Sequence, residues 1–115
     1  MTKSLNVEWW RSTATHMWRT YVALLRDGCT QDEMSETNKR IYVVCDHIFH
    51  TAFVPSDQDI LRAYFTCRWG DDIYMVEDYS AKHNIPVKII WMVIRRANRT
   101  AMEETGLLEK RDPDT

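Results

Sequence analysis

The chain has 115 residues, of which 44% are apolar and 28% are charged, as in an ordinary globular protein that forms one domain. Its longest uncharged apolar run, residues 89–94, is far shorter than the roughly 18 residues of a membrane span. Residues 1–8 lack the apolar core of a secretory signal. We therefore expect a cytoplasmic protein with no membrane partner, and its 3 cysteines are expected to be free thiols.

The charges are distributed unevenly along the chain. Lysine and arginine total 15 and aspartate and glutamate total 17, for a net charge of −2. Residues 82–101 contain five basic and no acidic residues, whereas residues 56–81 contain two basic and six acidic residues. The basic block is a candidate surface for phosphate groups. The alternative is a solvated helix face that pairs with neighbouring acidic residues.

Glycine and proline number only 3 each, which favours long helices over a turn-rich β fold. Asn6 is a suitable cap for a first helix that begins at Val7, and Gly28 is a suitable residue to end it. Apolar residues between them recur at steps of three and four, which is typical of one helix face. This stripe comprises Val7, Trp10, Ala14, Met17, Trp18, Tyr21, Leu24 and Leu25.

Two further helices are predicted before residue 70. Thr30 and Glu33 form the capping-box pattern of a second helix, and Ser56 with Asp59 could cap a third. The second helix would bury Met34, Ile41, Val44, Cys45, Ile48, Phe49 and Ala52. The third would bury Ile60, Leu61, Tyr64, Phe65 and Trp69.

A short fourth helix over residues 72–83 would end at Asn84, which tolerates the left-handed conformation. Pro86 would be the first residue of a fifth helix that ends at Gly106, although residues 89–94 could also form a strand. The inward residues of the fifth helix would be Ile90, Val93, Ile94, Ala97 and Ala101.

The predicted fold is therefore all-α, a compact bundle of about five helices that ends in a helix-turn-helix. Residues 1–108 would form the single domain, with a helical pair in residues 1–55 and the helix-turn-helix part in residues 56–108. Residues 109–115 would be a frayed tail.

The last two helices match the residue pattern of a helix-turn-helix. That motif needs a small residue where its helices cross, a turn residue that accepts positive φ, and apolar anchors for the second helix. Ser80 is the small residue and Asn84 stands at the turn, where glycine is more usual. The anchors would be Val76, Tyr79, Ile85, Ile90 and Val93. The alternative is two short helices joined by an ordinary turn.

Residues 56–108 resemble region 4 of sigma-70-type factors and the small phage late-transcription regulators of the RinA and ArpU type. The resemblance covers about half of the chain. It rests on the acidic-start segment from Ser56 to Phe65, on the pattern from Val76 to Arg96, and on the arginine-rich exit that leads to Gly106. It implies a DNA-binding module that acts at promoters, often with RNA polymerase, and it makes a phage or mobile-element origin plausible.

On this interpretation the helix after Pro86 reads duplex DNA and the protein regulates transcription. Lys88 and Arg95 are the candidates for base contacts, because their side chains can reach donor and acceptor edges. Val87 could contact a thymine methyl group. The candidates for phosphate contacts, which position the helix without reading sequence, are Lys82, Arg96 and Arg99.

A second interpretation is a protein-binding adaptor or inhibitor built on the same scaffold. Trp91 and Met92, with Ile89, make the reading helix apolar nearly all round, which usually signals burial on more than one side. Trp9 and Trp10 are adjacent, so one helix face cannot bury both. We therefore place these four tryptophan and methionine residues at an interface with a partner protein or with a second copy in a homodimer.

No feature of the sequence indicates an enzyme. Cys45, His47 and His50 lack the paired spacing of a structural zinc site. Acidic pairs at 71–72 and 77–78 fit the starts of helices better than acid–base chemistry. We predict no catalytic residue, no metal site and no cofactor.

Overall fold

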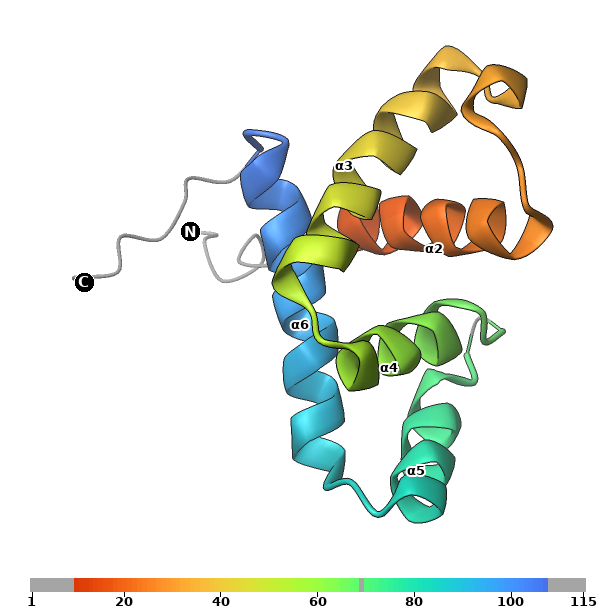
Figure 1. Ribbon diagram of the computed structural model, residues 1–115. Coiled ribbons are helices and arrows are strands. Elements are labelled where there is room, and N and C mark those ends of the chain that lie inside the picture. The colour runs from red at the N-terminus through yellow and green to blue at the C-terminus, as the bar shows by residue number, and fades with distance from the viewer. Residues whose placement is uncertain (1–9, 69, 108–115) are drawn as a thin grey trace.

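The computed structural model describes residues 10–68 and 70–107, and within them the chain is all-helical, as predicted (Figure 1). Five α-helices occur there, together with one turn of 3-10 helix, and no strand. They are α2 (Arg11–Asp27), η1 (Gln31–Glu33), α3 (Glu36–Ala52), α4 (Pro55–Phe65), α5 (Asp72–His83) and α6 (Val87–Glu104). All the other α-helices pack against α6, with α2 and α3 towards its carboxyl-terminal half and α4 and α5 towards its amino-terminal half (Figure 1).

The first helix ends where its sequence predicts. Gly28 has a φ of 67°, and its backbone N–H donates to the carbonyl of Leu25. The N–H of Cys29 donates to the carbonyl of Leu24, so the two bonds satisfy carbonyl groups that the helix end leaves open. The predicted start at Val7, its cap Asn6 and the tail at 109–115 lie outside the described residues.

The capping box of Thr30 and Glu33 is present, but it does not begin a long helix. Glu33 Oε1 accepts from the Thr30 N–H at 2.9 Å, and this hydrogen bond lowers the pKa of the carboxyl. The box encloses only η1, because Met34 is extended, with a ψ of 148°. A second cap begins α3, where Ser35 Oγ accepts from the Asn38 N–H at 3.1 Å. The predicted helix start is therefore wrong by about one turn.

The prolines also shift two predicted boundaries. Pro55 is the first residue of α4 and Val54 is its N-cap, so the predicted cap at Ser56 is wrong. Proline suits this position because its missing N–H would have no helical partner there. Pro86, predicted as the first residue of the last helix, is instead the N-cap of α6. Asn84 and the bounds of α5 are as predicted.

Trp18 lies at the centre of the core with none of its surface exposed. Its indole N–H donates to the carbonyl of Ala97 at 2.9 Å, which joins α2 to the middle of α6. Its rings also contact Tyr21, Phe53 and Phe65, with centroid distances of 5.8, 6.5 and 6.0 Å. One side chain therefore links α2, α6, α4 and the junction between α3 and α4.

Tyr21 provides the polar link between α2 and α3. It is fully buried, and its hydroxyl donates to Asp46 Oδ1 at 2.6 Å. Burial, with that hydrogen bond second, raises the pKa of the phenol far above its ordinary value. The hydroxyl therefore remains a donor throughout the ordinary pH range.

The predicted apolar stripes agree in large part with the observed core. Every inward residue predicted for α6 is buried, but Asn98 and Met102 are buried beside them and were not predicted. Val22 is likewise buried without having been predicted, whereas Ala52 is exposed. Trp69 lies outside the described residues.

We expect Trp18→Phe to lower the free energy of unfolding by about 2–4 kcal/mol, because it removes buried ring atoms and the hydrogen bond to Ala97. Urea unfolding followed by far-ultraviolet circular dichroism measures the loss. Trp91→Phe is the matched control, since Trp91 is only partly buried, and should lose less. Equal losses in the two variants would contradict the central role of Trp18.

Candidate nucleic-acid interface

A tight hydrogen-bonded turn joins α5 to α6. Asn84 has a φ of 55°, the left-handed conformation expected of it. The Ile85 N–H donates to the Ser80 carbonyl at 3.2 Å, and Ser80 Oγ donates back to the Ile85 carbonyl at 2.5 Å. Ser80 is therefore more than a small residue at a crossing point, because its hydroxyl holds the turn closed.

The apolar anchors on either side of this turn face inward, as predicted. Val76 and Ile90 are fully buried, and Val93 is nearly so. Tyr79 and Ile85 are partly buried against the same core. The start of α6 is thereby held against α4 and α5, and its opposite face is turned to solvent.

The solvent-facing side of α6 combines cations with apolar side chains. Val87, Lys88, Ile89, Met92, Arg95 and Arg96 are exposed there. A groove of about 420 Å³ runs along the helix, lined by Met92, Arg95, Arg96, Arg99, Thr100 and Glu103. We call Lys88, Arg95, Arg96 and Arg99 the α6 basic stripe. Thr100 adds a neutral hydroxyl group to this groove, and no sequence pattern had indicated it.

Two members of the α6 basic stripe are held by protein groups. The Arg96 guanidinium donates to the Ala52 carbonyl at 3.1 Å, lies 3.5 Å from Asp57 Oδ2, and sits 4.6 Å from the centroid of the Phe53 ring. Arg99 Nε donates to Glu103 Oε2 at 2.9 Å. A phosphate group would therefore have to share these two cations with existing partners.

The other two members have no such partner. Neither Lys88 nor Arg95 makes a hydrogen bond or an ion pair with any residue in the described part of the chain. Lys82, at the end of α5, lies 3.1 Å from Asp78 Oδ2. Acidic residues thus pair with part of the basic block, whereas Lys88 and Arg95 have no such partner within the described residues.

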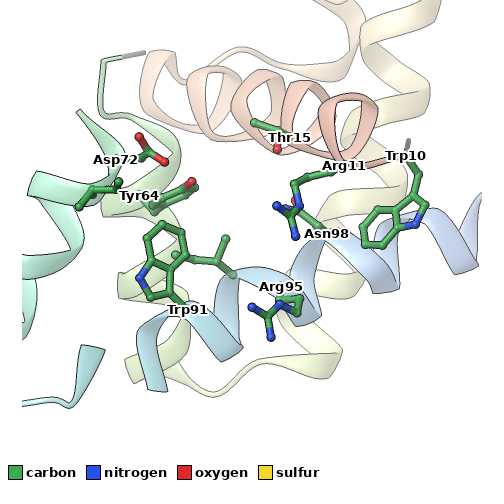
Figure 2. A pocket seen from close by; sticks show the side chains of 10 residues that line it. Trp10, Arg11, Thr15, Tyr64, Asp72, Trp91, Arg95 and Asn98 are labelled. Atoms are coloured by element: carbon green, nitrogen blue, oxygen red, sulfur yellow. The ribbon is translucent and has the colours of Figure 1, made fainter. Parts of the chain in front are cut away.

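Two tryptophans predicted at a partner interface are less exposed than expected. Trp91 is partly buried, because its ring packs edge-on against Tyr64 of α4 with a centroid distance of 5.8 Å (Figure 2). Trp10 is only 6% exposed, so its predicted place on an exposed interface is wrong. Met92 is exposed as predicted, at 52%. Trp9 lies outside the described residues.

Other candidate chemistry is not assembled in space. Within residues 10–68 and 70–107, no three histidine, cysteine, aspartate or glutamate side chains gather as metal ligands. Cys45 is buried, which raises the pKa of its thiol to about 12, and His50 instead lies 3.3 Å from Asp46 Oδ1. No helix in this part of the chain has the length and apolar character to cross a membrane.

Comparisons with known proteins add no family to these observations. No family model matches the chain, and neither a curated protein nor a solved structure matches it. Its function must therefore be argued from its own residues.

Tyr64, which supports Trp91, makes the fold sensitive to high pH. Burial, followed by the charge of Asp72, raises the pKa of its phenol from 10.0 to about 12. The folded state therefore holds this proton more tightly than the unfolded state does. The resulting stabilisation is complete below the unfolded pKa and is lost as the pH rises towards the folded pKa.

We expect Tyr64→Phe to lose less stability than the wild type between about pH 10 and about pH 12. Urea unfolding at several pH values across this window measures the difference. Tyr74→Phe, at an exposed position on α5, is the control and should follow the wild type. A Tyr64→Phe curve parallel to that of the wild type would refute this assignment.

Proposed function

We propose that this protein is a transcription regulator of phage or mobile-element type that binds duplex DNA through the exposed face of α6. The observation that carries the proposal is the pair Lys88 and Arg95. Both lie on that face, two helical turns apart, and neither has a partner within the described residues. A helix presented in this way, after a tight turn, fits the major groove and can read base edges there.

The side chains around this pair fit complementary roles. Lys88 and Arg95 would contact bases, and Val87, exposed at the start of α6, would meet a thymine methyl group. Lys82, Arg96 and Arg99 would contact phosphates. Because each of these three already has a carboxylate nearby, each would exchange or share that partner on binding.

The resemblance of residues 56–108 to region 4 of sigma-70-type factors adds a second partner to the proposal. RNA polymerase would be that partner, with the protein acting at a promoter in the cytoplasm.

Fluorescence anisotropy with a pool of random DNA duplexes tests the proposal directly. Binding should weaken as salt rises from about 50 to about 300 mM, because phosphate contacts release counterions. Three phosphate contacts correspond to a slope of about −3 in log affinity against log salt. Folded protein that shows no binding at low salt would overturn a direct role in DNA binding.

Arg95→Ala should relax specificity at one base position and cost about 1–3 kcal/mol of binding there. Affinity for sequences selected from the pool measures the effect. Arg40→Ala is the control, since Arg40 is exposed near the start of α3, at the far end of the molecule from the α5–α6 turn (Figure 1). Equal weakening on all sequences would instead make Arg95 a phosphate contact.

A protein-binding adaptor is the second candidate, and the apolar side chains on the same face favour it. Ile89 and Met92 are 43% and 52% exposed, and exposed apolar clusters mark interaction surfaces. The adaptor would hold its partner through Met92 and the exposed edge of Trp91.

Met92→Glu and Lys88→Glu distinguish the two candidates, because both residues are exposed and neither change disturbs the core. An adaptor should lose its partner with Met92→Glu and tolerate Lys88→Glu. A DNA-binding protein should lose duplex binding with Lys88→Glu, since that change reverses a charge that faces the phosphates and bases. Pull-down of the partner and anisotropy with DNA provide the two measurements.

A further inference from the structure

We propose that the cavity between α2, α4, α5 and α6 binds a small aromatic acid whose ring carries an N–H or O–H donor. The cavity holds about 300 Å³, the lower end of the range for small-molecule sites. Its lining comes from four helices and the turn before α2, and it includes Arg11, Tyr64, Trp91, Ile94, Arg95 and Asn98. The inference does not depend on DNA binding.

The aromatic part of the ligand is indicated by one wall of the cavity. Figure 2 shows the Trp91 and Tyr64 rings together on one side, across from Arg11 and Asn98. Their edge-to-face contact holds both rings in place, and Ile94 adds an apolar surface next to them. A flat ring makes the largest contact with such a wall at the smallest conformational cost.

The acidic group is indicated by two arginines on different helices. Arg11 reaches into the cavity from α2, and Arg95 lies on α6 at the exposed edge (Figure 2). Arginine binds a carboxylate through two parallel hydrogen bonds, which gives both strength and orientation. The one carboxylate in the lining, Asp72, lies beside Tyr64 on the aromatic side of the cavity (Figure 2).

The N–H or O–H donor on the ring of the ligand is inferred from Asn98. Its side chain is only 5% exposed, and its Oδ1 is buried with no hydrogen-bond partner in the described structure. Its neighbours on the same face of α6 are Ile94, Ala97 and Ala101, all buried and apolar. An unpaired buried acceptor costs about 1–3 kcal/mol, and an N–H or O–H group of a ligand would supply the missing donor.

Arg95 belongs to both the cavity and the α6 basic stripe. An acid bound in the cavity would therefore hold one of the two cations proposed to read bases. If both proposals hold, the acid lowers affinity for DNA without touching the other members of the stripe.

Titration calorimetry with three related probes tests the site. Indole-2-carboxylate carries the ring, the acid and the N–H donor, 1-methylindole-2-carboxylate lacks the donor, and indole lacks the acid. We expect saturable binding of indole-2-carboxylate, with each of the other two weaker by about tenfold or more. Absence of binding at millimolar concentration, or equal affinity for all three probes, overturns the proposal.

Variants of the lining residues give the complementary test. Arg95→Gln should weaken indole-2-carboxylate about tenfold, whereas Arg40→Gln, at an exposed position of α3 outside this cavity, should bind like the wild type. Asn98→Leu should also weaken binding while raising the melting temperature, because it removes an unpaired buried acceptor. A destabilised Asn98→Leu variant that still binds with wild-type affinity would show that Asn98 serves the fold alone. Because none of these measurements uses DNA, a negative result would overturn the ligand site without bearing on the proposed DNA binding.

Discussion

One buried nitrogen constrains much of this structure. The Trp18 ring is wholly enclosed, so its indole N–H must find an acceptor within the protein. The acceptor it finds is the Ala97 carbonyl, in the middle of the helix against which all the others pack. This bond sets how α2 lies on α6. Arg11 on one helix and Asn98 on the other therefore face a common cavity.

The sequence was sufficient to predict the helices, but less so their ends. Apolar spacing predicted the inward face of α6, and the left-handed tolerance of Asn84 predicted the end of α5. The start of α3 was wrong because a capping box can serve a single 3-10 turn as well as a helix. The candidate site residues were predicted from the chemistry of their side chains, without knowledge of their contacts. Arg96 contacts Ala52 and Phe53, which are more than forty residues away in the chain, so these contacts depend on tertiary packing. The place of Asn98 in a cavity depends on tertiary packing in the same way. Asn98 could have been identified as a candidate from the sequence, because it is a polar residue within the apolar stripe of α6.

The outer surface of α6 contains two kinds of chemistry on one helix. Its arginines and Lys88 suit an anionic partner, whereas Ile89 and Met92 suit an apolar one. Neutralisation of some cations by Asp57, Asp78 and Glu103 weakens the overall attraction for a polyanion. Binding to DNA would then depend more on the few unpaired groups, which favours discrimination between sequences over tight general attachment.

The central position of α6 also has a consequence for how the chain acquires its structure during synthesis. α6 follows the other described helices in the chain, and the acceptor for Trp18 comes 79 residues after it. While the ribosome is still adding those residues, α2, α3 and α4 can pack only on one another, and Trp18 lacks its hydrogen-bond acceptor. Domains generally fold as units. The core is therefore completed only after the last helix has emerged.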